Sequence, residues 1–340
     1  VNRSYTYLLG WQIMTETQNI SIMAEKISQH IFSEFCWEQK GPINQNWDCV
    51  LTEEHSSRTH PSDVVFSYKD PYSYYTVYIN CDLKSYKKTS IGQGAIGGAI
   101  SSLTRATDCA QLSESWQELY LDRDDNAQIV GLLFVYNHDG AYDTEFPSLL
   151  SKISPDNYNR LRKNNRVFVL GPQKICYLNT IVNDIRVLRG INELPSSENC
   201  SFFYPDLHRR KVVRSWGNPA TIEMLLSPIQ VLAYRNNLNN QPNSGLLIYY
   251  RRAGNTIDEF LYLIDYLFHY QLLQTTEIIK LRLPYPAPAA SVNFEKAKDE
   301  YIHSRTSSES LANRLSKINY SSVTNVVTVF SEIELGMENE

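Results

Sequence analysis

Two carboxylates and one lysine stand at the ends of two neighbouring apolar segments of the chain. Asp63 comes directly before one apolar run, and the triplet Asp82-Leu83-Lys84 ends a second run that begins near residue 75. Both runs are rich in residues typical of β-strands, so their ends can bring the three charged groups together at one edge of a sheet. Carboxylate oxygens bind hard divalent cations, and a cation with a lysine can stabilise charge on a phosphoryl group and orient water. The pattern therefore indicates hydrolysis of phosphodiester bonds.

The segments around these residues predict alternating helices and strands. Apolar residues recur at helical spacing over residues 18–39, which predicts a first helix. A second helix is expected from Ile91 to about Tyr120. The segments whose β-branched and aromatic residues predict strands are 47–51, 63–68, 74–83 and 129–136. The order of elements up to residue 137 is therefore α-β-β-β-α-β.

The turn Asn137-His138-Asp139-Gly140 marks the domain boundary that we expect. Residues 1–140 are predicted to form the first domain. Residues 141–340 continue to alternate between helical and strand patterns, and we expect them to form a second α/β region that serves recognition or docks a partner. A length of 340 residues suits two domains of ordinary size.

The segment from about residue 18 to 137 resembles the PD-(D/E)xK nuclease superfamily, which has a restriction-endonuclease-like fold with this αβββαβ core. The signature of that family is a Pro-Asp pair at the second strand, followed in the third by Asp or Glu, one apolar residue and Lys. Here Pro61-Ser62-Asp63 carries one extra residue between the proline and the aspartate, and Asp82-Leu83-Lys84 fits the second part. The spacing between Asp63 and Asp82 suits two neighbouring strands joined by a turn.

The resemblance implies a role for each of these residues. Asp63 and Asp82 would bind Mg²⁺ or Mn²⁺, with the backbone carbonyl of Leu83 as a further ligand. Lys84 would orient the attacking water and offset the negative charge that develops on the phosphate. Asn in place of either aspartate would remove the negative charge that attracts the cation. Ala in place of the lysine would remove the positively charged hydrogen-bond donor.

Many members of the superfamily add a glutamate from the first helix, which holds a metal-bound water or a second ion. Glu25 is the candidate that we prefer for this position, and Glu34 is its rival. Both residues border the apolar stripe of the predicted helix, on opposite sides, so their spacing does not choose between them. Some members also use a polar residue from the second helix, for which Gln93 and Gln111 are candidates.

A hypothesis of a different class is a catalytically inactive module of the same fold that binds nucleic acid or a partner protein. Asp63 can be read as the cap of a strand, and Asp82 and Lys84 as an exposed pair on one face, because residues two apart in a strand point the same way. The formal net charge of −5 mildly favours this hypothesis. A local basic surface can still serve a nuclease.

A third hypothesis is a dinucleotide site at Gly92–Gly97, which matches the pattern G-x-G-x-x-G. Eight residues (84–91) separate this segment from the preceding strand, so the turn is not tight. The acidic residue that such sites place after the next strand is also missing from the expected position. The segment is therefore predicted to be a helix of small residues packed against the sheet.

The composition indicates a globular protein, with 42% hydrophobic and 20% charged residues. Neither a transmembrane helix nor a secretory signal is expected, because no apolar segment has the required length. The six cysteines are scattered, with no C-x-x-C pair and no Cys/His cluster of zinc-binding spacing. We therefore expect reduced core thiols in a cytoplasmic protein.

The sequence thus predicts a Mg²⁺-dependent endonuclease that cleaves DNA, with defence against foreign DNA as the favoured role. Residues 141–340 are expected to bind a protein partner or a second copy of the chain. No Walker A motif is present, so an ATP-driven step would require a partner protein.

Overall fold

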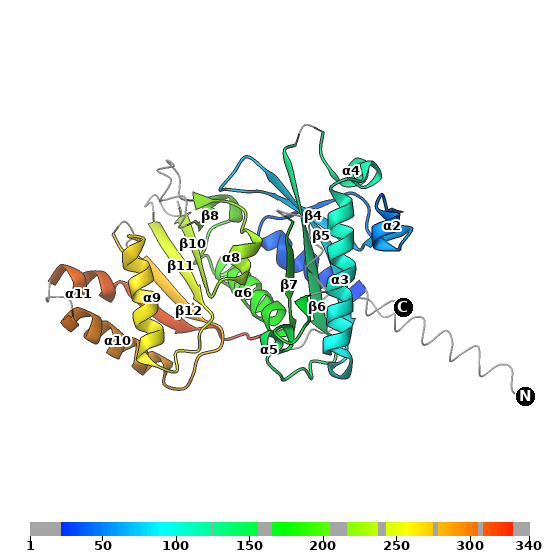
Figure 1. Cartoon of the computed structure of the whole chain (residues 1–340). Helices are drawn as coiled ribbons and strands as arrows, with labels where there is room; N and C mark the ends of the chain where they lie inside the picture. Colours follow the sequence, from blue (N-terminus) through cyan, green and yellow to red (C-terminus); the bar gives the residue numbers. More distant parts are fainter. Residues whose placement is uncertain are drawn as a thin grey trace, which may run out of the picture. The chain divides into compact units, whose positions relative to one another are not determined.

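The computed structural model describes residues 22–123, 125–155, 165–204, 216–236, 243–274, 278–304 and 309–328. Within these residues the chain folds into two compact units (Figure 1). The first contains the described residues up to Cys176 together with Thr328, and the second spans Tyr177–Val327. This division falls later in the chain than residue 140, where we predict a domain boundary. Both units contain helices and sheets, which confirms the expected mixed α/β class.

A five-stranded sheet forms the centre of the first unit. In spatial order its strands are β1 (Glu38–Lys40), β4 (Val64–Lys69), β5 (Thr76–Tyr86), β6 (Ala127–Asn137) and β7 (Val167–Leu170). β4 runs antiparallel to β1 and β5, whereas β6 is parallel to both β5 and β7. A separate two-stranded sheet pairs β2 (Gln45–Asp48) with β3 (Thr59–Ser62).

The first helix ends earlier than its apolar pattern predicts. Residues 22–34 are helical and a turn follows before β1, whereas we predict a helix over residues 18–39, of which the first lie outside the described part. Cys36 adopts a left-handed backbone conformation with φ 60°, and the N–H of Trp37 donates to the carbonyl of Phe32 at 3.0 Å. These features close the C-terminal end of the helix.

The strand predicted over residues 47–51 lies in the small sheet and not in the central one. β2 ends at Asp48, and the chain then enters the short helix α2 (Thr52–His55), which has two glutamates in its first turn. Acidic residues at that position favour a helix start through the helix dipole. The place beside β4 in the central sheet is taken by β1, a strand of three residues that the helical pattern conceals.

The single helix predicted from Ile91 to Tyr120 is divided in two. α3 (Gln93–Ala110) and α4 (Glu114–Tyr120) are separated by a turn. Ser113 in that turn caps α4, because its side-chain oxygen accepts a hydrogen bond from the N–H of Trp116 at 3.4 Å. A serine that caps a new helix also stops the previous one from continuing.

Helices cover both faces of the central sheet (Figure 1). Phe32 of the first helix packs edge to face against Phe66 of β4 and Phe134 of β6, with ring centroids 5.1 and 6.0 Å apart. Ala106 of α3 shares an apolar cluster with Val65 of β4. Successive residues of a strand point to opposite faces, so the first helix and α3 lie on opposite sides of the sheet.

The second unit is built on a six-stranded sheet. In spatial order its strands are β13 (Ile318–Ser322), β12 (Ile278–Leu283), β11 (Asn243–Tyr250), β10 (Ile229–Asn236), β8 (Cys200–Phe203) and β9 (Trp216–Gly217). β12 is parallel to β11 and β13, whereas β10 is antiparallel to β8 and β11. The other α-helices among the described residues are α5 (Phe146–Leu150), α6 (Pro172–Gly190), α8 (Ile222–Leu226), α9 (Ile257–His269), α10 (Ala290–Ser304) and α11 (Glu309–Ser316).

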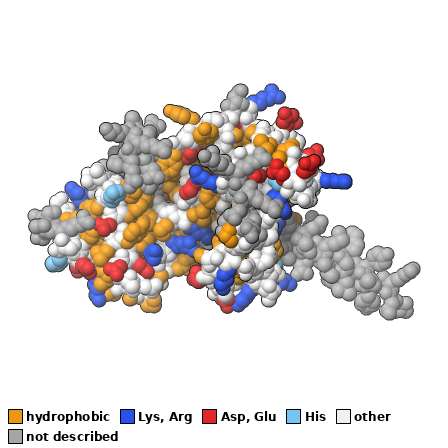
Figure 2. Space-filling view, in the orientation of Figure 1, with side chains coloured by type: hydrophobic (Ala, Val, Ile, Leu, Met, Phe, Trp, Pro, Cys, Tyr) orange, Lys and Arg blue, Asp and Glu red, His pale blue; other side chains and the backbone are white. Residues whose placement is uncertain are grey.

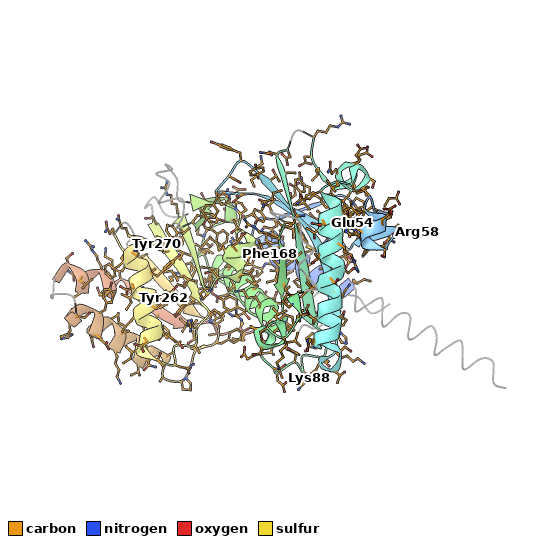
Figure 3. All side chains as sticks on the ribbon, viewed as in Figure 1. Glu54, Arg58, Lys88, Phe168, Tyr262 and Tyr270 are labelled. Carbon is orange, nitrogen blue, oxygen red and sulfur yellow. The ribbon has the colours of Figure 1, made fainter. Side chains whose placement is uncertain are left out.

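Helix α9 has a buried apolar face and an exposed aromatic one. Phe260 and Leu267 belong to the core of the second unit. Tyr262 is 56% exposed, and the ring of Tyr266 packs on that of Tyr270 with centroids 4.8 Å apart. Hydrophobic side chains reach the surface of this unit in Figure 2, and Figure 3 labels Tyr262 on α9 and Tyr270 directly after its end. None of the described helices is both long and apolar enough to span a membrane.

The glycine-rich segment begins α3 and packs on the sheet through part of its surface only. Ile96 and Ile100 are buried in a cluster with Leu133 of β6. A Cβ added at Gly98 would meet no atom within 4 Å, so this glycine faces open space. The close approach between helix and sheet occurs at Gly131 of β6, where an added Cβ would collide with Thr107 and come within 3.1 Å of Leu103.

We therefore predict opposite effects for two glycine-to-alanine substitutions. Gly98→Ala should stabilise the protein by about 0.5–1 kcal/mol, because alanine is the better helix former and the added methyl group is free of clashes. Gly131→Ala should destabilise it by about 1–3 kcal/mol, because α3 must move away from the sheet. Denaturant unfolding of the two variants beside wild type measures both changes. Equal effects of the two substitutions would contradict this packing.

Candidate active site

Asp63 stands where the chain passes from the small sheet to the central one. β3 ends at Ser62 in its pairing with β2, and β4 begins at Val64 in its pairing with β5. The backbone carbonyl of Asp63 accepts a hydrogen bond from the N–H of Asn44 at 2.8 Å, and its N–H donates to the carbonyl of Cys81 at 3.3 Å. The residue is therefore held at the fork between the two sheets, by the segment that leads into β2 on one side and by β5 on the other.

The side chain of Asp63 completes the edge of β5 at this fork. Val64 is opposite Cys81, so β5 runs on past the first residue of β4. There the N–H of Leu83 donates to Asp63 Oδ2 at 2.7 Å. A carboxylate thus takes the hydrogen bond that a backbone carbonyl would accept in a continuing strand. This bond fixes the carboxylate next to the residues on either side of Leu83.

Asp82 and Lys84 meet Asp63 at this position, as the sequence analysis expects. Alternate residues of β5 share a face, and Lys84 Nζ forms an ion pair with Asp82 Oδ1. The two side chains are only 33% and 14% exposed, for the lysine and the aspartate respectively. The structure therefore brings two carboxylates and one ammonium group together in a place of restricted solvent access.

The electrostatics of this group fit a divalent cation. Burial, followed by the negative charge of Asp82, raises the pKa of Asp63 to about 6, although the Leu83 N–H and the Lys84 charge act in the opposite direction. Burial alone would lower the pKa of Lys84, but the charges of Asp82 and Asp63 outweigh it and raise that pKa, so the side chain stays an ammonium ion. The two carboxylates are close enough to repel each other, and a bound Mg²⁺ or Mn²⁺ ion would relieve this repulsion by accepting their oxygens as ligands.

Glu25 lies on the helix that covers the opposite face of the sheet. Burial raises the pKa of Glu25, and the neighbouring charge that acts on it is that of Lys26. Asp82 and Lys84 share their face of β5 with Tyr78, which packs in the cluster below α3. To take part in the site, the carboxylate of Glu25 would have to reach the aspartates around the end of the sheet. The role of Glu25 therefore stays a prediction, as does that of Glu34.

The two glutamine candidates lie on α3 or at its end, at different places. Gln111 Nε2 donates to the carbonyl of Ile129 at 3.4 Å. Ile129 is opposite Tyr78 of β5, four residues before Asp82, so Gln111 is roughly 13 Å from the aspartates along the strand. Gln93 donates to the carbonyl of Lys152 at 2.5 Å, at the start of α3. Neither contact involves the aspartates.

Asn80 is a residue of this face that the sequence analysis did not single out. It lies two positions before Asp82, is only 1% exposed, and has no hydrogen-bond partner for its side-chain oxygen or nitrogen among the described residues. Its place in the strand alternation, N-x-D-x-K, is the signal that could have drawn attention to it. A buried amide of this kind is a candidate for holding water beside the carboxylates.

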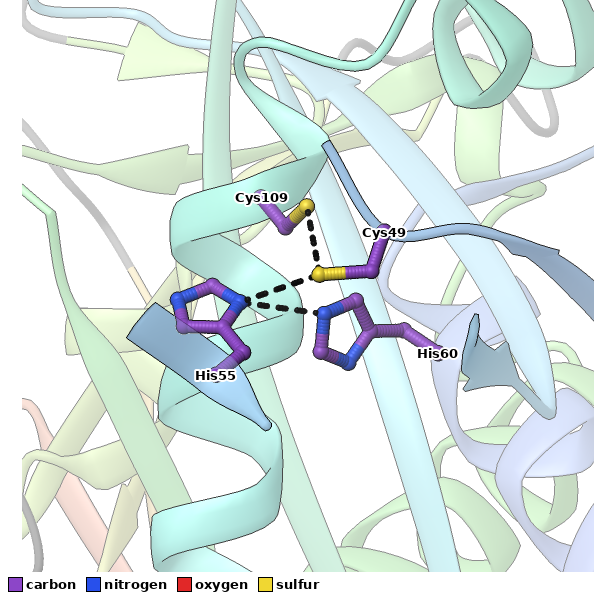
Figure 4. Close-up of side chains that lie close together, drawn as sticks. All are labelled: Cys49, His55, His60 and Cys109. Atoms are coloured by element: carbon purple, nitrogen blue, oxygen red, sulfur yellow. Dashed lines mark hydrogen bonds between the residues drawn. The ribbon is translucent and has the colours of Figure 1, made fainter. Parts of the chain in front are cut away.

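A second cluster was also missed, because its members are far apart in the sequence. Cys49, His55, His60 and Cys109 are all buried, and their ligand atoms lie within 4.8 Å of one another (Figure 4). The expectation of scattered thiols with no Cys/His cluster is therefore wrong for Cys49 and Cys109. All six cysteines are free of disulfide bonds.

Comparison with protein families finds a match in this part of the chain. Residues 14–174 match the family model described as the GAPS4 protein PD-(D/E)XK nuclease domain. The match confirms the resemblance drawn from the Asp63, Asp82 and Lys84 motif. No curated protein and no solved structure matches the chain.

We predict that Asp63→Asn stabilises the metal-free protein near neutral pH. The substitution removes one of two crowded charges, and an amide oxygen can still accept the Leu83 N–H. The wild-type carboxyl has a folded-state pKa of about 6 against an ordinary value of 3.8. The Asp63 carboxyl therefore contributes its full stabilisation below about pH 3.8, and this contribution is lost as the pH rises through about 6.

The advantage of Asp63→Asn over wild type should accordingly be largest above pH 6 and shrink on acidification. Thermal unfolding in EDTA, followed across this range, measures the difference between the two midpoints. Asp299→Asn removes an exposed carboxylate of α10 and serves as the control. A difference that is constant across the range would contradict the crowding of Asp63 by Asp82.

Proposed function

We propose that this chain, which contains a PD-(D/E)XK nuclease domain over residues 14–174, hydrolyses phosphodiester bonds in DNA with the help of Mg²⁺ or Mn²⁺. The observation that carries the proposal is the convergence of Asp63, Asp82 and Lys84 at the fork between β3 and β4. The order of the first helix, β1, β4, β5, α3 and β6 supports a restriction-endonuclease-like αβββαβ core around this site.

Each residue of the site has a distinct task in the proposed reaction. Asp63 and Asp82 hold the cation through their carboxylates, and the backbone carbonyl of Leu83 adds an oxygen ligand. When bound, the cation supplies positive charge that polarises the scissile phosphate. Lys84 keeps its proton, so its N–H groups can orient a water molecule and stabilise the charge that develops on the phosphate oxygens. Glu25 is the proposed fifth group, which positions water.

Lysines that follow β5 can bind the phosphates of the substrate. Lys87 is exposed and stands three residues beyond Lys84. Lys88, labelled in Figure 3, forms an ion pair with Asp143 at 2.7 Å at the same end of the strand. Ammonium groups in such positions bind phosphates without reading the base sequence. Because the net charge of the chain is −5, attraction to the phosphates must come from such a local group of lysines and not from the charge of the whole protein.

The second unit is proposed to bind a protein partner or another copy of the chain. Tyr262 supports this role, because an exposed aromatic side chain on a long helix is common in interfaces. A nuclease that acts on foreign DNA needs a means of recognising it, and a separate unit of this size could supply one. Defence against foreign DNA, in the cytoplasm, is therefore the biological role that we propose.

Asp82→Asn and Lys84→Ala should each reduce cleavage of plasmid DNA by about 100-fold or more, because they remove a cation ligand and the cationic donor. Nicking and linearisation of supercoiled DNA with Mg²⁺, and with EDTA in its place, measure the loss. Lys69→Ala is the matched control, since Lys69 is an exposed lysine at the far end of the same β4–β5 hairpin.

The same assay distinguishes the nuclease from an inactive module. DNA binding that persists in EDTA, with no cleavage under any divalent cation, would overturn the proposed activity and favour a binding role. Cleavage that survives both substitutions would place the chemistry elsewhere in the chain. Melting curves of each variant verify that it is folded.

A parallel pair of variants decides which glutamate serves the site. Glu25→Gln should lower the cleavage rate at subsaturating Mg²⁺ by about tenfold or more, because it removes a carboxylate that orders water or a second ion. Glu34→Gln should leave the rate close to that of wild type. Titration of Mg²⁺ against the initial rate measures both, and the opposite ranking would assign the role to Glu34.

A further inference from the structure

We propose that Cys49, His55, His60 and Cys109 bind one Zn²⁺ ion at a structural site that is separate from the nuclease centre. Thiolate and imidazole groups in a two-to-two set are the tetrahedral ligands that zinc prefers. The four ligand atoms are close enough to surround a single ion (Figure 4). The proposal concerns a different metal, different ligands and a different role from those of the Asp63 and Asp82 pair.

Three of the six distances between the ligand atoms match the edges of a zinc tetrahedron. With Zn–S and Zn–N bonds of about 2.3 and 2.05 Å, the S–S, S–N and N–N edges are about 3.8, 3.6 and 3.3 Å. The corresponding distances are 3.7 Å from Cys109 Sγ to Cys49 Sγ, and 3.4 Å from Cys49 Sγ to His55 Nδ1. A third distance, from His55 Nδ1 to His60 Nε2, is 3.2 Å, and the other three pairs of ligand atoms lie within 4.8 Å. The first three distances lie within about 0.2 Å of the edges expected around one ion.

A network of hydrogen bonds without metal accounts less well for the same contacts. His55 Nδ1 is close to both Cys49 Sγ and His60 Nε2. An imidazole nitrogen has either one N–H or one lone pair in the plane of its ring, so it can make one well-directed hydrogen bond of this kind. Two close partners in different directions, with a fourth ligand atom beyond them, are what coordination to a central ion produces.

Burial raises the pKa of the Cys109 thiol, but two backbone N–H groups beside the cluster act in the opposite direction and favour the thiolate. The N–H of Val50 donates to Cys109 Sγ at 3.2 Å, and the N–H of Leu51 also points to this sulfur. Zinc binds cysteine as the thiolate, and hydrogen-bond donors that do not themselves bind the metal stabilise the negative charge of that thiolate. These two N–H groups follow Cys49 directly, so one ligand places the donors for the other.

The site is closed, which indicates a structural and not a catalytic role. Exposure is 6% for Cys49, 7% for His55, 3% for His60 and zero for Cys109. The buried ring of Trp47 packs against that of His60, with centroids 5.1 Å apart. Four protein ligands with no open position are typical of structural zinc sites, whereas catalytic sites keep a place for water.

The ligands come from separate elements, which the ion would fasten together. Cys49 follows β2, His55 ends α2, His60 lies in β3, and Cys109 is in the last turn of α3. The helix α2 has only four residues and would be marginal without such support. Zinc would therefore hold the small sheet against α3, next to the fork at Asp63.

Metal analysis of the full chain tests the proposal without reference to cleavage. Protein that is expressed in medium with zinc and then dialysed against a weak chelator should contain about one Zn²⁺ per chain, as measured by elemental mass spectrometry. Cys49→Ser and Cys109→Ser should each reduce this to a small fraction. Cys200→Ser is the matched control, because Cys200 is a buried thiol of the second unit, and it should retain the zinc.

Cobalt substitution keeps the test decisive if a serine variant fails to fold. Wild-type protein loaded with Co²⁺ should show the intense visible absorption of tetrahedral cobalt and a thiolate-to-metal charge-transfer band in the near ultraviolet. The milder variant His60→Cys should retain the metal with a shifted spectrum, because it exchanges one nitrogen for sulfur. Asp63→Asn and Asp82→Asn should leave the zinc content and this spectrum unchanged, which separates the site from the Mg²⁺ centre.

Two outcomes would overturn the assignment. The first is wild-type protein that carries no stoichiometric zinc and gives an octahedral or absent cobalt spectrum, in which case the cluster is a hydrogen-bonded part of the core. The second is zinc that persists in both serine variants but is lost from Asp63→Asn. That result would place the ion at the nuclease centre.

Discussion

The hydrogen bond from the Leu83 N–H to the carboxylate of Asp63 is the interaction on which the geometry of the site depends. β5 extends past β4, so its edge would carry an N–H with no strand beside it. A side chain satisfies that donor, and the cost of an unpaired backbone group is avoided. The same contact places the carboxylate between Asp82 and Lys84. One hydrogen bond therefore ends the sheet and assembles the proposed metal ligands.

This assembly is electrostatically unfavourable without a cation. Asp63 and Asp82 repel each other in a place where water is scarce, and Lys84 compensates only part of the charge. The surrounding core offsets the cost, since Val64, Val65 and Tyr78 are fully buried on the two strands that carry the group. Strain of this kind at a site, supported by a rigid sheet, is typical of residues selected for binding and not for stability.

The sequence predicted the parts of this site that depend on local patterns. The alternation of a strand places Asp82 and Lys84 on one face, and a short connection brings Asp63 beside them, so no knowledge of the tertiary structure was needed. The three-residue strand β1 was missed because its residues continue the helical pattern. The break before α4 was missed because Ser113 is one polar residue within an otherwise helical segment. Both failures concern boundaries, where local propensity is weakest.

The Cys/His cluster could not be found in this way, since Cys109 joins the other three residues only when α3 packs on the sheet. Its relation to the nuclease centre also depends on tertiary structure. Ser62 is buried and accepts hydrogen bonds from the indoles of Trp47 and Trp116, at 3.0 and 3.1 Å.

His60 and Ser62 share a face of β3, because they are two residues apart. The chain that leads into Asp63 is therefore held on one side by the cluster and by two tryptophans, and on the other by β5. A carboxylate that must accept one specific N–H needs a backbone fixed to within a fraction of an ångström. The small sheet supplies that constraint, which gives a physical reason for the proposed structural ion to lie near the proposed metal site of Asp63 and Asp82.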